Sequence, residues 1–294
     1  MNDPVQTHPA RFSASDPWSG QTVVLGTMHG KEVAIAPAMA SLGLHLVVPP
    51  GFDTDRFGTF TREIPRAGDQ IEAARAKARA ALDVTGASLA LASEGSFGPH
   101  PAIPWIPANR EIVLLLDARD GREYRGMAVS TKTCHEHAVV HTLAEAEAFA
   151  ARLDFPRHAL VARAGTDEHA PLLARGIARL EDLREHVSAG LRVASGVFLE
   201  VDLRAHLNPT RMAVIAEAAR DLVRVLAARC PACGSPGFVA VARVPGLPCG
   251  DCGLPTRETL HEVLACEPCG ASIEQRPQGA SSVADPGRCD ACNP

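Results

Sequence analysis

Residues 89–101 read Leu-Ala-Leu-Ala-Ser-Glu-Gly-Ser-Phe-Gly-Pro-His-Pro. The first four residues form a short apolar run that is typical of a buried β-strand. Glu94 then stands alone between small residues, and the glycines and prolines after it predict that the strand ends there in a tight loop. Ligands in open α/β sheets bind outside the carboxyl ends of strands, so Glu94 is a candidate functional residue. The alternative is a turn in which Glu94 caps a neighbouring amide.

The segments before this stretch predict a β–α–β unit. A β-branched run at 22–25 leads into a glycine-containing loop at 26–32, and an amphipathic helix follows as far as Leu42. A second strand is expected over 45–48. Such a connection favours a right-handed crossover and parallel pairing. A longer, alanine-rich helix is predicted over 69–83, with an aspartate as its N-cap.

The rest of the chain up to about residue 228 continues the alternation of strands and helices. Strands are predicted over 111–117, 124–130, 158–162 and 196–202, and helices over 142–153, 180–187 and from 209 onward. Asp120-Gly121 is a hairpin signal between two of these strands. Arg211 lies in the first turn of the last helix, where the helix dipole disfavours a cation. Either an anion binds there, or a carboxylate such as Asp202 pairs with Arg211.

A histidine-rich segment at 131–141 alternates as a strand would. Cys134, His135, His137 and His141 could form a metal site, but a solvated sheet face is the favoured interpretation. The acidic loop at 51–65 is also ambiguous, because its Asp53 and Asp55 could hold a divalent cation or simply be solvated, with Glu63 as a further reserve ligand.

Length and composition set the domain organisation and the broad class. The 294 residues are 46% hydrophobic, which is enough for a sizeable core, and the net charge of −5 gives no global attraction to nucleic acid. The polar start, without an apolar core, predicts a disordered tail over 1–19, and the absence of a signal peptide or membrane-length run predicts a cytoplasmic protein. We expect a mixed α/β domain over 20–228, with a mostly parallel-cored sheet and flanking helices, and a small zinc-ribbon segment over 229–294.

Eight of the nine cysteines form four Cys-x-x-Cys pairs in the last part of the chain. They are Cys230/Cys233, Cys249/Cys252, Cys266/Cys269 and Cys289/Cys292. Four thiolates make a closed tetrahedral site, so the sequence predicts two structural zinc ions. Sequential pairing of the motifs is the simplest arrangement, and an interleaved cross-brace is the alternative. A segment this small has little core, so metal binding should supply its folding energy. Its few basic residues disfavour a nucleic-acid surface.

Several motifs together resemble an uncharacterised bacterial domain-of-unknown-function family. They are Gly-Thr-Phe at 58–60, Ser-Glu-Gly-Ser-Phe-Gly-Pro-His-Pro at 93–101, Asn-Pro-Thr-Arg-Met at 208–212 and the terminal Cys-Asn-Pro. This resemblance covers nearly the whole chain and implies no known activity.

The layout of residues 22–228 is also similar to the inosine/xanthosine triphosphate pyrophosphatase superfamily, which includes the Maf-like proteins. Thr27 and Lys31 match its phosphate loop, with Met28 in place of an asparagine. Glu72, Ala74, Lys77 and Ala78 match its metal-binding helix, with Ala73 in place of an asparagine. Glu94-Gly95 matches its acidic loop, and His206 and Arg211 are a loose counterpart of its base-contacting element.

This resemblance implies a Mg²⁺-dependent hydrolase that splits a nucleoside triphosphate into the monophosphate and pyrophosphate. The implied catalytic residues are Glu94, Glu72, Lys31 and Lys77, the substrate-binding residues Thr27, His29, Arg211, His206, Ser93 and Ser96, and the magnesium ligands Glu72, Glu94, Asp53 and Asp55. The alternatives are a non-catalytic nucleotide- or partner-binding protein that docks through the zinc segment, and an RNA-binding zinc protein. Whether the chain forms a homodimer is left open.

Overall fold

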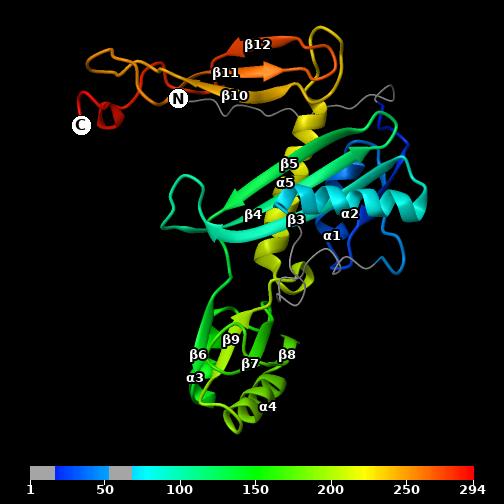
Figure 1. Cartoon of the computed structure of the whole chain (residues 1–294), viewed down its shortest axis with the longest axis vertical. Helices are drawn as coiled ribbons and strands as arrows, with labels where there is room; N and C mark the ends of the chain where they lie inside the picture. The colour runs from blue at the N-terminus through cyan, green and yellow to red at the C-terminus, as the bar shows by residue number, and fades with distance from the viewer. Residues whose placement is uncertain (1–16, 53–67) are drawn as a thin grey trace, which may run out of the picture. The chain divides into compact units, whose positions relative to one another are not determined.

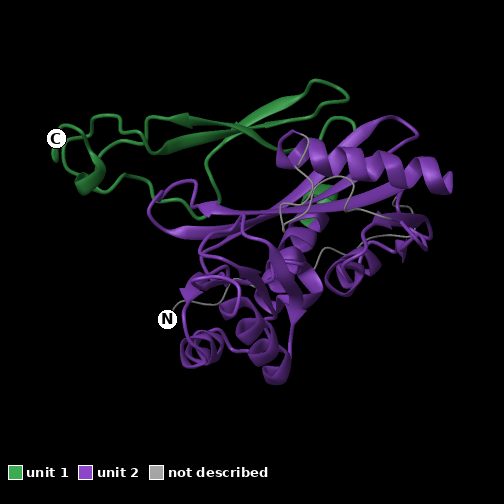
Figure 2. Ribbon diagram, turned by 60° about the horizontal axis from the view of Figure 1, so that its bottom comes forward, with its two compact units in different colours: residues 1–10, 224–294 green, residues 11–223 purple. Residues whose placement is uncertain are grey.

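The computed structural model describes residues 17–52 and 68–294. The described residues divide into two compact units, 17–223 and 224–294, which Figure 2 shows in different colours. The division falls within the long helix α5 (Pro209–Ala227). No described helix has both the length and the apolar composition that a membrane crossing requires.

The larger unit begins with a five-stranded mixed sheet in the order β2-β1-β3-β4-β5. Its elements, in chain order, are β1 (Thr22–Gly26), α1 (Glu32–Ala40), β2 (His45–Val47), α2 (Gln70–Thr85), β3 (Leu89–Pro99), β4 (Pro107–Asp117) and β5 (Arg122–Ser130). Strand β1 pairs in parallel with β2 and β3, whereas β3, β4 and β5 are antiparallel. The predicted parallel β–α–β start and the mixed α/β class are therefore confirmed. The expected mostly parallel core is wrong, because among the described strands of this sheet only the pairings of β1 are parallel, while the long strands β3, β4 and β5 are joined by hairpin-type antiparallel pairing.

Helix α2 covers one face of this sheet (Figure 1). Its small residues Ala74, Ala78 and Ala81 allow it to lie close to Ala90 and Ala92 of β3 in a common buried cluster. The helix begins at the predicted cap, because the Asp69 carboxylate accepts hydrogen bonds from the amides of residues 71 and 72. On β3 the even-numbered side chains therefore face α2 and the odd-numbered ones face the opposite side.

The opposite face packs against the part of α5 that belongs to this unit. A side chain at Gly126 of β5 would lie 2.2 Å from the Ala218 carbonyl oxygen, so glycine permits the close approach of helix and strand. The backbone amide of Met127 donates to the Asp221 carboxylate over 2.7 Å. Gly126 is paired with Val113 on β4, so α5 lies over the same face as the odd-numbered residues of β4 and β3.

The prediction that the strand ends before Glu94 is wrong. Strand β3 runs through Glu94 and Gly95 to Pro99, and its pairing with β4 continues to the pair Pro99–Pro107. A regular antiparallel ladder overrides the preference of glycine and proline for turns, because every residue to the end of the strand has a partner on β4.

The larger unit contains a second, antiparallel sheet in the order β6-β9-β7-β8. Its elements are β6 (His137–Val140), α3 (Leu143–Arg152), β7 (Leu160–Ala164), β8 (Leu172–Ile177), α4 (Leu180–Leu191) and β9 (Val197–Val201). Both helices contribute to its own hydrophobic core, in which Phe149, Leu183 and Leu199 are buried. The expected strand over 131–141 is shorter than predicted, since residues 131–136 lie outside β6. A 3-10 turn, η2 (Ala205–Leu207), precedes α5.

Residues 17–19, which the sequence assigned to the tail, belong to the described structure. Pro17–Gly20 form a turn, and the indole of Trp18 is buried edge-on against Tyr124, with ring centroids 5.7 Å apart. The expected tail over 1–19 thus includes a residue of the core.

The smaller unit is built around an antiparallel sheet in the order β10-β11-β12, and its described strands have no fully buried residue. The strands are β10 (Val239–Pro245), β11 (Thr259–Ala265) and β12 (Ser272–Gln275), and a 3-10 turn, η3 (Pro286–Arg288), follows. Its small buried cluster contains Phe238 with Cys230 and Cys266, so the core of this unit adjoins the cysteine motifs.

Candidate functional site

Strand β3 extends beyond the end of β1. The last residue of β1, Gly26, is paired with Ala92, and β3 continues to Pro99 without β1 beside it. The chain leaves β1 toward β2 on one side and returns to β3 on the other, so this is the topological switch point of the parallel part of the sheet. Ligands bind at such points in open α/β sheets. The loop 27–31 and the start of α1 lie at this position.

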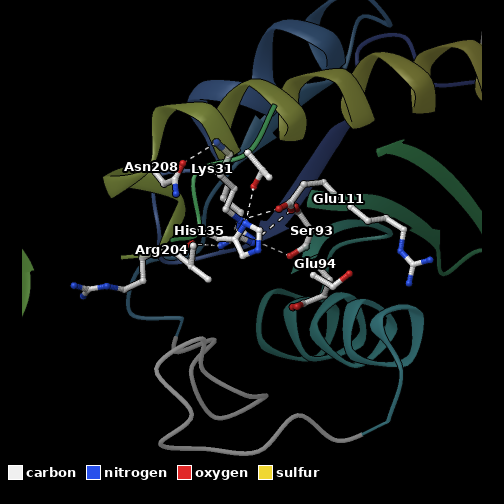
Figure 3. Close-up of polar contacts among 12 residues, drawn as sticks. Lys31, Ser93, Glu94, Glu111, His135, Arg204 and Asn208 are labelled. Atoms are coloured by element: carbon white, nitrogen blue, oxygen red, sulfur yellow. Dashed lines mark hydrogen bonds and ion pairs between the residues drawn. The ribbon is translucent and has the colours of Figure 1, made fainter. Parts of the chain in front are cut away.

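Lys31 lies at this switch point. It is the N-cap residue of α1, only 6% of it is exposed, and its ammonium donates a 2.7 Å hydrogen bond to the Ser93 carbonyl oxygen. Burial, together with the positive charges of Arg211 and Lys77, lowers the pKa of Lys31 to about 7, although Glu94 and Glu111 partly oppose the shift. Figure 3 shows Lys31 close to Ser93 and Glu111.

On the α2 face of the sheet, the carboxylate of Glu94 forms an ion pair with Lys77. Both are buried, with 3% of Glu94 and 8% of Lys77 exposed. Gln70, at the start of α2, donates to the Glu94 carbonyl oxygen over 2.7 Å and to the Arg110 carbonyl oxygen over 2.9 Å. The start of α2 is therefore fixed to both β3 and β4 beside the ion pair.

On the opposite face, Glu111 of β4 and Arg211 of α5 form a second ion pair, with 2.7 Å between Nε and Oε1. Neither residue is more than 1% exposed. Gly95 makes this pair possible, because a side chain there would lie 2.1 Å from a Glu111 carboxylate oxygen and 2.6 Å from Arg211 Nη2. The Asn208 side chain caps α5 by accepting from the Arg211 amide over 2.9 Å.

The partner of Arg211 is thus a carboxylate, but it comes from a different element than expected. Asp202, which the sequence suggested, pairs with Arg204 instead, with 2.7 Å between Nη2 and Oδ2. Asp202 also accepts from the Gly176 amide over 3.0 Å. Its carboxylate therefore links Gly176 of the neighbouring sheet to Arg204, which lies just before α5 in the chain.

The two ion pairs and Lys31 define what we call the buried charge cluster: Lys31, Lys77, Glu94, Glu111 and Arg211. Among the described residues Lys31 forms no ion pair. With every member ionised, three cations face two carboxylates, so the cluster carries one positive charge in excess. A bound anion would offset both this excess and the desolvation of Lys31.

Other predicted substrate-binding residues lie around the cluster. Thr27 is buried and lines a pocket of about 380 Å³ together with the loop 48–52. His29 and His206 stack with their ring centroids 5.4 Å apart, and burial together with Arg204 lowers the pKa of His206. The Ser96 hydroxyl donates to the Gln70 side chain over 3.3 Å. Their roles in binding stay predictions.

The structure places Glu72 away from this cluster. It completes the capping box of α2, where its exposed carboxylate accepts from the Asp69 amide over 2.9 Å. The other predicted magnesium ligands, Asp53 and Asp55, and the reserve Glu63 lie outside the described residues.

Sequence reasoning missed Glu111 and Gln70 as members of the site. The sequence places Glu111 only at the start of an apolar strand. A lone acid in such a strand does indicate a buried ion pair or a functional role, because carboxylates are seldom buried without a partner. Gln70 falls within the helix predicted over 69–83, and its sequence context assigns it no role. The β3–β4 register and the approach of α5 give both residues their partners, and neither follows from local sequence.

The histidine-rich segment does not form a metal site. His135 packs against Phe97, His137 stacks on Phe198, and His141 contacts the Ser195 carbonyl oxygen over 2.8 Å. Burial raises the pKa of the Cys134 thiol to about 11. Within residues 17–52 and 68–294, the groups suited to a metal ion are the two cysteine sets described next.

The cysteine motifs of the smaller unit form two four-thiolate clusters with interleaved pairing. One contains Cys230, Cys233, Cys266 and Cys269, and the other contains Cys249, Cys252, Cys289 and Cys292. Sulfur–sulfur distances across the paired motifs are 3.5–3.8 Å. A tetrahedral Zn²⁺ with Zn–S bonds of ~2.3 Å places its sulfurs ~3.8 Å apart, so both clusters fit zinc. Of the two arrangements left open by the sequence, the structure has the cross-brace.

The glycine after each of the first three motifs has the backbone conformation that the metal turn requires. Gly234, Gly253 and Gly270 have φ values of 73°, 70° and 71°. Each donates its amide to the carbonyl oxygen of the first cysteine of its motif, over 2.8–3.0 Å. The fourth motif has Asn293 at this position, and its amide makes the equivalent bond over 2.9 Å. The four turns are therefore built alike.

Comparison with known proteins agrees with the first of the two resemblances. No curated protein matches the chain. The family model described as "Domain of unknown function (DUF6671)" matches residues 77–294. This match includes Lys77, both carboxylates of the buried charge cluster, Arg211 and all eight zinc-type cysteines, and it begins after Lys31. The chain therefore belongs to the DUF6671 family of domains of unknown function.

Proposed function

We propose that the chain binds the phosphate groups of a nucleotide at the switch point beyond the carboxyl end of β1. The observation that supports this most directly is the position of Lys31, a buried amine at the switch point whose own charge is the one that the two ion pairs around it leave unbalanced. A phosphate group would supply the missing negative charge, and lysine binds phosphate as a compact point charge. The nearby pocket beside Thr27 offers room for part of the ligand.

Ligand binding should be coupled to protonation of Lys31. In the free protein its pKa is about 7, and a bound phosphate would favour the charged form. Binding should therefore be strongest below pH 7 and weaken by roughly tenfold per pH unit above it, until the pKa of the bound state is reached.

We further propose that this site hydrolyses the nucleotide. The order of the loop bearing Thr27 and Lys31, the helix bearing Lys77 and the strand bearing Glu94 supports this step, as does the resemblance in layout to the inosine/xanthosine triphosphate pyrophosphatases. Water would attack the α-phosphorus, and the bond to the bridging oxygen would break to release the monophosphate and pyrophosphate. Glu94 would orient the water or a Mg²⁺ ion that arrives with the phosphates.

Glu94 must leave Lys77 to serve a metal ion, since its carboxylate is in an ion pair. A negatively charged phosphate would attract Lys77 and release the carboxylate. The described residues contain no preassembled carboxylate site for magnesium, so the metal would be held mainly by the nucleotide.

Calorimetry with a nucleoside triphosphate tests the binding step. Lys31→Met should weaken binding at pH 6.5 by about tenfold or more, because a charge-assisted contact is lost. Lys132→Met is the matched control, since Lys132 is an exposed lysine. Failure of the wild-type chain to bind any triphosphate, or equal binding by Lys31→Met, would overturn the proposal.

Pyrophosphate release with Mg²⁺ tests the hydrolytic step separately. Turnover should disappear in Glu94→Gln while binding remains. Saturable binding without turnover in the wild-type chain would instead support the alternative of a non-catalytic nucleotide-binding protein. In either case we assign the zinc to a structural role in the smaller unit, because each cysteine set is a closed four-ligand site.

A further inference from the structure

Unsatisfied polar groups gather on the face of the five-stranded sheet that carries Glu111. Asn109 of β4 is only 1% exposed, yet neither the nitrogen (Nδ2) nor the oxygen (Oδ1) of its side-chain carboxamide has a hydrogen-bond partner. The hydroxyl of Ser93, which is 2% exposed, also lacks one. In the described part of the chain five buried side-chain atoms have no hydrogen bond, and three of them belong to these two residues. Buried polar groups without a hydrogen bond are rare, and each one lowers the stability of the fold. Their clustering here therefore indicates that a ligand satisfies them.

The strand register places these groups in one row. Ser93, Gly95 and Phe97 of β3 face the same side as their cross-strand partners, and Phe97 is paired with Asn109. Arg211 lies over this row, with its Cζ atom 6.0 Å from the centre of the Phe97 ring. The row therefore runs from Ser93, whose carbonyl oxygen holds Lys31, to the amide of Asn109.

An aromatic surface lies at the far end of the row. The rings of Phe97 and His135 have their centroids 5.3 Å apart, and both residues are half-buried. Solvent therefore reaches the row at the Phe97 end, above the buried Asn109.

We propose that Asn109 and Phe97 form the subsite for the base of the nucleotide; this inference rests on the proposed function. A carboxamide presents a donor beside an acceptor, which matches the edge of a base that carries both. An aromatic ring offers the stacking surface that bases use. The four residue-to-residue steps from Ser93 to Phe97 span ~13 Å of strand, which is about the length of a nucleotide from its terminal phosphate to its base.

The test compares two probes that carry similar phosphate charge, inosine triphosphate and inorganic tripolyphosphate. Calorimetry on the full, zinc-loaded chain should show that the nucleotide binds at least tenfold more tightly than tripolyphosphate. Asn109→Leu, which is similar in size and apolar, should reduce this difference on the order of 10- to 100-fold, while tripolyphosphate binding stays unchanged. The Lys31→Met variant should bind both probes more weakly, and by a similar factor.

The outcomes separate this inference from the proposed function. If neither probe binds the wild-type chain, the proposed function fails. If both bind equally well, or if Asn109→Leu weakens both to the same extent, the phosphate site stands and the base subsite is overturned. Should Asn109→Leu not fold, Phe97→Leu at the half-buried ring gives the same comparison, with the melting temperature measured first. If both variants keep the wild-type preference for the nucleotide, the base subsite is overturned, and buried water alone satisfies Asn109.

Discussion

Replacement of Lys31 by methionine should stabilise the protein, and the gain should depend on pH. The pKa of Lys31 falls from 10.5 to about 7 on folding. Between these values the folded state binds fewer protons than the unfolded state, so the stability contributed by this group rises with pH and is lowest below pH 7. A shift of this size corresponds to a cost of about 5 kcal/mol at pH 6, ~3 kcal/mol at pH 8 and ~1 kcal/mol at pH 10.

Methionine removes this cost because it carries no charge and fills irregular space in a core. The lost hydrogen bond to the Ser93 carbonyl oxygen reduces the gain by about 1 kcal/mol at each pH. The variant should therefore exceed the wild-type chain in free energy of unfolding by roughly 4 kcal/mol at pH 6 and by almost nothing at pH 10. A residue that destabilises the fold by this amount is one that a functional site retains at the expense of stability.

Urea unfolding followed by tryptophan fluorescence measures this difference. Both tryptophans, Trp18 and Trp105, belong to the larger unit, so the signal reports that unit and not the zinc unit. Lys132→Met is the control, and its exposed side chain should give no pH-dependent change. A stability difference between Lys31→Met and wild type that is constant from pH 6 to pH 10, or a less stable variant at pH 6, would refute the reasoning.

Two further predictions concern packing and metal content. Gly95→Ala should destabilise the larger unit by about 1–3 kcal/mol in the same urea assay, because its methyl group overlaps the buried ion pair, whereas Gly98→Ala meets open space and should have little effect. The cross-brace predicts that Cys233→Ser with Cys269→Ser removes one zinc per chain and that Cys233→Ser with Cys252→Ser removes both, as measured by native mass spectrometry. Sequential pairing would give the opposite result for the two double variants.

Much of the fold was predictable because it depends on local patterns. The parallel start, the N-caps at Asp69 and Asn208 and the Asp120-Gly121 turn follow from short-range preferences that the structure confirms. The zinc-type cysteines were predictable for a related reason, since a metal turn imposes a fixed spacing. The pairing between motifs was not, because any two Cys-x-x-Cys motifs could supply the four thiolates that a site needs.

The extent of β3 was not predictable from its own sequence. Glycine and proline after Glu94 indicate a turn, but the ladder with β4 holds the strand as far as Pro99. The continuation of β3 also determines the geometry of the candidate site, because a strand alternates its side chains between two faces. Glu94 and Glu111 therefore face opposite sides of the sheet. If Glu94 lay in a loop, as the sequence predicted, the strand alternation could not be used to assign its side chain to either face.

Arg211 shows how the sequence located the site while leaving its chemistry open. A cation in the first turn of a helix is disfavoured by the helix dipole, and this misplacement indicated either an anion or a carboxylate partner. The structure supplies the carboxylate, Glu111, and buries the pair completely. Yet a buried pair is balanced in charge, so it leaves the positive excess on Lys31. In the proposed function the anion therefore neutralises Lys31 rather than Arg211, and the pH dependence of Lys31→Met measures the cost of burying that cation without an anion.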